Sequence, residues 1–220
     1  MRAPSMPFLL LGQLLASNVW ADDFKTVQDY CQNIKAAPKA RIESCLALIS
    51  SGKVSKAYAP QVYYTVAYAW SELHDFERSI EYTRKEIEVA SENMKTEIAS
   101  GKVSDFSREA WPKQMSFMYK MLGQYFALAR LSGIDTKSDK ALKYAKAELA
   151  SYDAAIAYNH ENDKAYIARA EVHSLLCEES QASADQQAAM RIARGRDDDA
   201  AYNQYRFEAL PGCVTAWKPK

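Results

Sequence analysis

Apolar residues recur every three or four positions along most of the chain, which is the spacing of one buried face of an α-helix. Glycines follow several of these stretches and prolines stand where new stretches begin, as they do at the ends and starts of helices. The residues concerned are Gly52, Gly101, Gly133 and Gly195, with Pro38, Pro60 and Pro112. The pattern predicts nine helices, over residues 23–36, 38–50, 60–72, 75–99, 110–131, 137–159, 163–177, 180–194 and 197–209.

The composition also favours an all-α fold. Only 7 of the 220 residues are glycine and 7 are proline, too few for the many turns of a β-sandwich. The 28 lysines and arginines balance the 28 aspartates and glutamates, so no overall positive charge attracts nucleic acid, and we expect no nucleic-acid partner. No linker rich in glycine, serine or proline divides the chain.

The first 21 residues have the features of a secretory signal peptide. Arg2 supplies a positive charge, residues 8–16 are mostly apolar, and Val19 and Ala21 are small residues before the expected cleavage point. An uncleaved membrane anchor is the alternative, but it needs about twice that apolar length. We expect cleavage after Ala21 and export, to the bacterial periplasm or otherwise outside the cell, with no integral membrane segment in the mature chain.

Export makes the four cysteines candidates for two disulfides, with three possible pairings. Cys31 and Cys45 lie in the apolar stripes of two successive predicted helices, nearly equidistant from the tight connection that ends at Pro38. Antiparallel helices would therefore bring these two cysteines together. We predict a Cys31–Cys45 disulfide, which would stabilise the hairpin by about 3 kcal/mol. Two free thiols in the core are the alternative.

One seven-residue string occurs twice. Residues 49–55, ISSGKVS, recur at residues 98–104 as IASGKVS, displaced by 49 positions. Both copies end a predicted helix, and each is followed by an irregular stretch, a proline and an aromatic-rich helix. The recurrence therefore predicts a repeated helical hairpin.

The helices after the first copy carry aromatic, leucine and small residues at a recurring spacing. These residues are Tyr63, Ala67, Trp70 and Leu73 in one hairpin, Tyr119, Leu122, Gly123 and Phe126 in the next, and Tyr166, Ala170, His173 and Leu176 in a third. In this respect the chain resembles the tetratricopeptide repeat family. The resemblance implies a superhelix of antiparallel hairpins in which Ala67, Gly123 and Ala170 mark the points where paired helices cross closely.

The chain also departs from the regular repeat. The small residues are 56 and 47 positions apart, whereas regular repeats recur about every 34 residues, so we expect an irregular array in which the long helices 75–99 and 137–159 overhang. On the second helix of the first hairpin, the small and aromatic positions of the repeat fall on Ser79, Thr83 and Glu86, which predicts different packing there.

The resulting organisation has four parts. A signal peptide at 1–21 precedes an N-terminal hairpin cap at 22–58, repeats at 59–195, and a capping helix and irregular tail at 196–220. In such a stack the last helix ends beside the end of helix 163–177. We therefore predict a second disulfide between Cys177 and Cys213, which would fix the capping helix to the last hairpin.

The resemblance implies a binding surface for a protein or peptide on the concave face, which the first helix of each hairpin lines. The ligand-facing positions of the family map to Gln61, Tyr64, Tyr68 and Glu72 in the first hairpin, to Phe117, Lys120, Gln124 and Leu128 in the second, and to Lys164, Ile167 and Glu171 in the third. Aromatic side chains there would supply contact area and charged ones would set the register of an extended peptide. Burial beneath the long helices is the alternative for these residues.

The sequence carries no recognised catalytic or metal-binding motif. We interpret His74 and His160 as residues of helix ends and His173 as a core position, and carboxylate pairs such as Glu86 and Glu88 as solvated. We therefore expect a non-enzymatic scaffold without cofactor or metal.

Two other functions are also compatible with the sequence. A small-molecule carrier or enzyme would use a pocket between the long helices, with tyrosines such as Tyr125, Tyr144 and Tyr152. A structural subunit of a cell-envelope assembly would instead expose an apolar patch or pack through its end hairpins.

Overall fold

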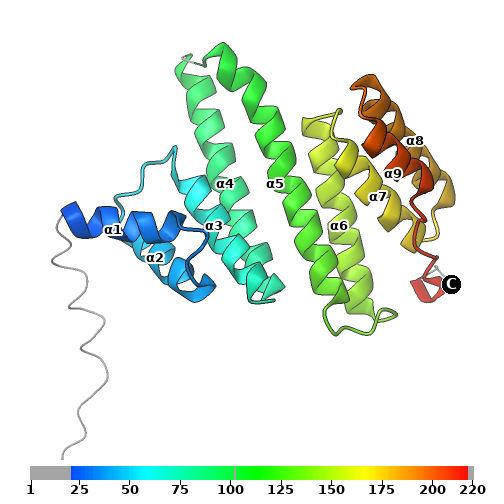
Figure 1. Ribbon diagram of the computed structural model, residues 1–220, viewed down its shortest axis with the longest axis horizontal. Coiled ribbons are helices and arrows are strands. Elements are labelled where there is room, and N and C mark those ends of the chain that lie inside the picture. The colour runs from blue at the N-terminus through cyan, green and yellow to red at the C-terminus, as the bar shows by residue number, and fades with distance from the viewer. Residues whose placement is uncertain (1–20, 102, 218–220) are drawn as a thin grey trace, which may run out of the picture.

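The computed structural model describes residues 21–101 and 103–217, and over these the chain is all-α (Figure 1). Its helices are α1 Ala21–Gln32, α2 Pro38–Ser50, α3 Ala59–Glu72, α4 Phe76–Ser100, α5 Asp105–Leu131, α6 Asp139–Tyr158, α7 Asp163–Leu175, α8 Glu179–Gly195 and α9 Asp199–Phe207, followed by a 3-10 helix at Thr215–Trp217. Each predicted helix has its counterpart in this part of the chain. The predicted signal peptide, apart from Ala21, lies outside the described residues.

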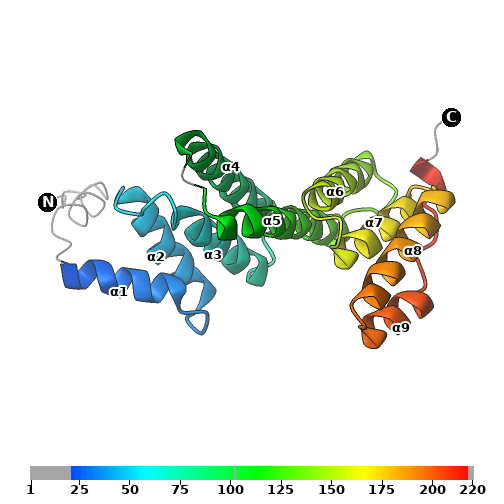
Figure 2. The same ribbon diagram turned by 90° about the horizontal axis from the view of Figure 1, so that it is seen from above.

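Helices that follow one another in sequence pack side by side, from α1 at one end of the molecule to α9 at the other (Figure 1). Seen from above, α4 and α6 lie on the same side of α5 (Figure 2). The chain is therefore a row of antiparallel hairpins, as the sequence predicts, and the long hairpin of α4 and α5 extends beyond its neighbours (Figure 1).

Polar residues cap the starts of five helices. Each side chain accepts a hydrogen bond from the backbone N–H three residues further on, which satisfies a donor that the helix itself leaves free. The capping residues are Asp75, Ser104, Ser138, Asn162 and Asp198.

The two copies of the repeated string end their helices in the same way. Gly52 and Gly101 adopt left-handed backbone conformations with φ of 66° and 68°, which glycine adopts without steric cost. Their N–H groups bond to the carbonyls of Ile49 and Ile98 at 3.2 and 3.1 Å. Gly195 differs, because it is the last residue of α8 and the left-handed position falls two residues later, on Asp197.

The predicted start of α5 was wrong by five residues. Pro112 does not lie near the start of the helix but inside it, and α5 begins at Asp105. The cap explains the difference, because the Ser104 hydroxyl accepts a hydrogen bond from the Ser107 N–H at 3.0 Å and starts the helix before the proline is reached. Pro112 then costs the helix one backbone hydrogen bond without ending it.

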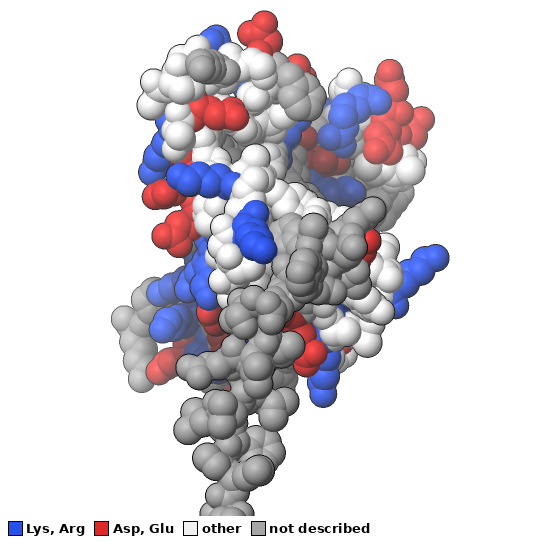
Figure 3. Space-filling view, turned by 90° about the vertical axis from the view of Figure 1, so that its left-hand side faces the viewer, with Lys and Arg blue, Asp and Glu red and all other residues white. Residues whose placement is uncertain are grey.

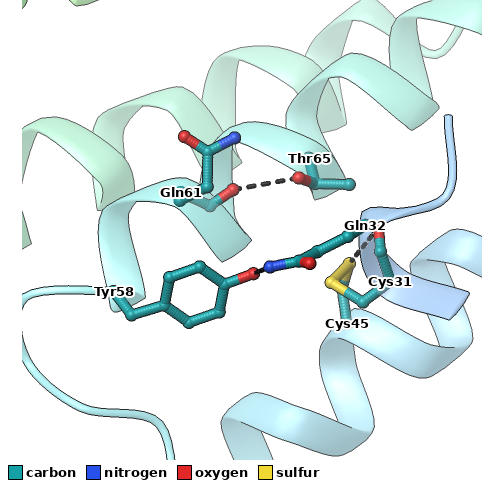
Figure 4. Close-up of a disulfide and its surroundings, with 6 residues drawn as sticks. All are labelled: Cys31, Gln32, Cys45, Tyr58, Gln61 and Thr65. Atoms are coloured by element: carbon teal, nitrogen blue, oxygen red, sulfur yellow. Dashed lines mark hydrogen bonds between the residues drawn. A yellow bond between two sulfur atoms is a disulfide. The ribbon is translucent and has the colours of Figure 1, made fainter. Parts of the chain in front are cut away.

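The N-terminal disulfide joins α1 to α2 as predicted, with the Cα atoms of Cys31 and Cys45 4.8 Å apart (Figure 4). Both cysteines are fully buried in a cluster with Leu48, Val62 and Val66. The Gln32 amide also donates a hydrogen bond to the Tyr58 hydroxyl, which ties α1 to the segment before α3. The hairpin is therefore fixed both to itself and to the next one.

The C-terminal disulfide joins Cys177 to Cys213, again as predicted, with the Cα atoms 4.7 Å apart. The tail that follows α9 is more ordered than the sequence suggests. The Val214 N–H donates to the Leu175 carbonyl at 2.9 Å, and Trp217 packs against Tyr152 and Val172. The tail thus turns back and covers part of α6 and α7.

The small residues predicted at helix crossings are buried. Ala67 and Ala170 have no exposed surface. A Cβ atom added to Gly123 would lie 2.5 Å from Cε1 of Tyr152, a ring atom on the facing helix α6. Only glycine therefore allows α5 and α6 to approach this closely.

Both signs of charge are interspersed on the face at the N-terminal end of the stack (Figure 3), in keeping with the balanced composition. Within residues 21–101 and 103–217, no helix combines the length and the apolar character that a membrane crossing requires.

Candidate functional site

Three aromatic rings from two helices lie together on the side of the stack that α3 and α5 share. Tyr64 of α3 stacks on Tyr68 with ring centroids 6.3 Å apart, and lies 6.1 Å from the ring of Phe117 on α5. Tyr68 and Phe117 are 40% and 41% exposed. Aromatic rings that are this accessible and in mutual contact form a ready contact surface for a partner.

Lys120 borders these rings, and Lys164 of a third helix lies close enough to Lys120 for their charges to interact. The Lys120 ammonium of α5 lies 5.1 Å from the centre of the Phe117 ring. Burial, together with the neighbouring charge of Lys164 on α7, lowers the pKa of Lys120 below its ordinary value. Among the described residues neither lysine has an ion-pair partner, so two positive charges meet here without an anion. We call Tyr64, Tyr68, Phe117, Lys120 and Lys164 the α3–α5–α7 face.

Glu72, also predicted in the site, forms an ion pair with Arg41 of α2. Its carboxylate accepts a hydrogen bond from Arg41, and the Arg41 guanidinium lies 5.7 Å from the centre of the Tyr68 ring. Arg41 is 1% exposed and leaves Nε and Nη1 without a partner in the described structure. The sequence does not identify Arg41 as a residue of the site, because its position depends on how α2 packs against α3.

A buried acid lies close to the aromatic rings. Glu86 of α4 is 3% exposed, and its Oε2 has no hydrogen-bond partner among the described residues. Burial raises the pKa of this carboxyl to about 8, so it is mainly neutral at pH 7. The interpretation of Glu86 as solvated was therefore wrong, whereas Glu88 is exposed as expected.

A buried tyrosine shares this interior. Tyr125 of α5 is 3% exposed, and burial raises its pKa while its neighbour Ser71 opposes that rise. Because neither Tyr125 nor the neutral form of Glu86 carries charge at pH 7, neither offsets Lys120 and Lys164. The α3–α5–α7 face is therefore positively charged.

Two predicted site residues, Gln61 and Gln124, are exposed on α3 and α5. The Gln61 carbonyl accepts a hydrogen bond from the Thr65 hydroxyl within the same helix (Figure 4). No side-chain hydrogen bond of either glutamine joins them to the aromatic rings in the described structure. Leu128, another position implied by the resemblance, is 40% exposed further along α5.

The last two predicted site residues lie elsewhere. Ile167 is 8% exposed and packs with Ala189, Ala193 and Tyr205 of α8 and α9, so it belongs to the core and offers little surface to a partner. α9 covers this position. Glu171 lies in a separate group of charges with Arg130 and Glu208, where burial and the charge of Glu208 raise its pKa.

The tyrosines of the carrier alternative are buried. Tyr125, Tyr144 and Tyr152 are each less than a tenth exposed and belong to apolar clusters. His173 is mostly buried and lies 2.5 Å from a carboxylate oxygen of Glu178, while His74 forms the turn before α4. Over the described ranges, no group of three or more histidines, cysteines, aspartates or glutamates is placed to hold a metal ion.

Comparison with known proteins assigns the chain to no family. No protein-family model matches the chain, and no curated protein matches it. A function for this protein is therefore inferred from the arrangement of its helices, disulfides and exposed side chains.

Proposed function

We propose that the chain is a non-enzymatic scaffold of the tetratricopeptide-like kind, and that its α3–α5–α7 face binds a protein or peptide that presents an acidic side chain next to an apolar one. The observation that carries this proposal is a cluster of two exposed aromatic rings and one half-buried ring, beside two lysines that have no ion-pair partner among the described residues. The rings come from α3 and α5 and the lysines from α5 and α7, so one partner segment could contact every second helix of this part of the stack.

The chemistry of the face favours an acidic partner. Arg41 and Lys120 already lie over the rings of Tyr68 and Phe117, which leaves less room for a cation of the partner. Lys120 and Lys164 repel each other, and an anion between them would relieve that repulsion. The rings would add apolar contact area, which commonly supplies much of the affinity at such surfaces.

The proposed compartment is the periplasm or another extracytoplasmic space. Two disulfides between buried or partly buried cysteines are consistent with an oxidising environment. Proteins exposed there are natural partners for an exported scaffold.

The direct test is crosslinking of the intact chain in an envelope extract, followed by recovery and identification of the bound protein. Replacing both Tyr64→Ala and Tyr68→Ala, or both Lys120→Glu and Lys164→Glu, should reduce recovery by about tenfold or more, because each pair removes one half of the contact. For the charge pair we also expect the loss to be smaller at high salt, where the attraction is already screened.

The matched control is Tyr30→Ala, which removes another exposed tyrosine on α1, outside the α3–α5–α7 face. It should leave recovery unchanged. Equal recovery with wild type and both double variants would reject the α3–α5–α7 face as the binding surface.

A further inference from the structure

A surface hollow lies near the tip of the long hairpin formed by α4 and α5. Its volume is about 360 Å³, and its lining residues are Met94, Ile98, Gly101, Val103, Arg108, Trp111 and Pro112. Most of the lining is apolar, and Ile98 is 58% exposed. The end of α4 from residue 95 to residue 100 is exposed throughout, so the packing of the stack does not account for apolar side chains here.

The repeated string shows what covers the corresponding residues in its first copy. Ile98 and Val103 of the hollow correspond to Ile49 and Val54, 49 positions earlier in the chain. In the first copy both side chains pack against the cluster that contains Cys31, and Val27 of α1 packs against it too. Val54 also borders a smaller hollow in the first copy, so the contrast lies in the isoleucine: Ile49 is half-buried in the cluster that Val27 of α1 joins, whereas Ile98 is 58% exposed.

The lengths of the helices explain why Ile98 in the second copy is more exposed than Ile49 in the first. α1 has 12 residues and covers α2, which has 13. α3 has only 14 residues beside the 25 of α4. A second, smaller hollow bordered by Ala57 and Pro60, at the N-terminal end of α3, shares Met94 and Trp111 with the first. Among the described residues, the end of α4 therefore extends past the start of α3, so α3 does not cover it.

The charge beside the hollow indicates the polarity of what would fill it. The Arg108 guanidinium has no hydrogen-bond or ion-pair partner among the described residues. An acidic side chain on the flank of an incoming helix would pair with it. α1 itself is such a helix, because it carries Asp22, Asp23 and Asp29 against one lysine.

We propose that the hollow between Met94, Ile98, Val103, Arg108 and Trp111 is the docking site for an acidic amphipathic helix of a partner protein, seated as α1 is seated on α2. The helix cannot be α1 of a second copy, because the apolar side of that α1 is joined to its own α2 through Cys31–Cys45. This site is separate from the α3–α5–α7 face and does not depend on the function proposed for that face.

The probe is a synthetic peptide of residues 21–34 with Cys31→Val, acetylated and amidated, which keeps the apolar stripe and the three aspartates of α1. It is titrated into the intact ¹⁵N-labelled chain while the Trp111 indole N–H resonance is followed, assigned with Trp111→Phe. We expect a saturable shift of this resonance. Ile98→Asp should weaken the affinity by about tenfold or more, and Arg108→Glu should weaken it by a smaller factor.

Two variants of the chain and a scrambled peptide serve as controls for binding at the hollow. Ile34→Asp changes an isoleucine that is 73% exposed in the connection between α1 and α2 and should leave the affinity unchanged, as should the combined Tyr64→Ala and Tyr68→Ala variant. Equal binding of a scrambled peptide, or an affinity unaffected by Ile98→Asp, would overturn the proposal. A shift produced by sodium laurate but not by the peptide would also overturn it, because the hollow would then take an amphiphile.

Discussion

A glutamate is buried at each of two junctions where three helices meet, but only one of the two glutamates forms an ion pair in the described structure. Where α3, α4 and α5 meet, Glu86 is 3% exposed and has an unpartnered oxygen in the described structure. Where α5, α6 and α7 meet, Glu148 is 2% exposed and forms an ion pair with Arg130, with a nitrogen–oxygen distance of 3.1 Å. The first acid is buried without a cation and the second with one.

The two carboxyls differ in whether a cation opposes the effect of burial. Burial raises the pKa of Glu148 to about 7, but Arg130 opposes that rise. Without a cation, the pKa of Glu86 rises to about 8. Glu86 is therefore neutral over more of the physiological pH range, which leaves the lysines of the α3–α5–α7 face without a compensating charge.

The largest loss of stability is expected from Arg130→Met, which would leave Glu148 buried without a cation, as Glu86 is. Removing one partner of a buried ion pair costs about 3–5 kcal/mol. The pKa of Glu148 should rise further, so the stability of the variant should fall more steeply than that of wild type as the pH rises from 5.5 to 8. Urea unfolding at both pH values measures this. Adding Glu148→Gln should recover part of the loss, and a pH-independent loss would contradict the ion-pair explanation.

The next largest effect is expected from Glu86→Gln, which should gain stability relative to wild type as the pH rises. A folded pKa of about 8 against an ordinary value of 4.5 means that wild type is stabilised by the bound proton at low pH and loses stability as the pH rises towards 8. Each pKa unit corresponds to about 1.4 kcal/mol, so the variant should gain about 3 kcal/mol on wild type between pH 4.5 and 7. The cost of its buried amide is the same at both pH values and does not enter this difference.

Urea unfolding at half-unit pH steps checks the Glu86 prediction. The control is Glu88→Gln, which changes an exposed glutamate on the same helix and should keep the wild-type slope. If Glu86→Gln also keeps that slope, Glu86 is not the titrating group.

The smallest of the three effects is expected from Gly123→Leu, in the second junction. The added side chain would collide with the Tyr152 ring, which already lies 2.5 Å from an ideal Cβ position. Overpacking of this kind costs about 1–3 kcal/mol. Thermal unfolding measures the loss of stability. The control is Gly195→Ala, because no atom lies within 4 Å of a Cβ added at that position; Gly133 is unsuitable because its positive φ would strain an alanine. An unchanged melting temperature would mean that the two helices can separate at little cost.

Much of this fold follows from local signals in the sequence. The apolar spacing, the helix-ending Gly52 and Gly101, and the positions of four cysteines on successive antiparallel helices were enough to predict the helix order and both disulfides. The start of α5 was missed because the cap at Ser104 outweighed the proline at Pro112. Capping and proline signals compete, and only the position of both in the folded helix decides between them.

The charges of the candidate site were harder to predict. Ser79 and Thr83 are buried and donate hydrogen bonds to the backbone carbonyls four residues earlier, so polar residues can occupy these packing positions. Glu86, three residues further on, continues the same buried stripe, and its place in the repeat pattern was the available signal. Arg41 and the meeting of Lys120 with Lys164 depend on contacts between helices far apart in sequence, which spacing along one helix does not reveal.

The two disulfides each close a short stretch of chain, with sequence separations of 14 and 36. Neither spans the central helices, so each bond links only segments near its own end of the row. The first crosslink needs only the opening hairpin to be folded, and the second needs only α7, α8, α9 and the tail. Reduction of one bond would therefore loosen one terminus and leave the opposite terminus crosslinked.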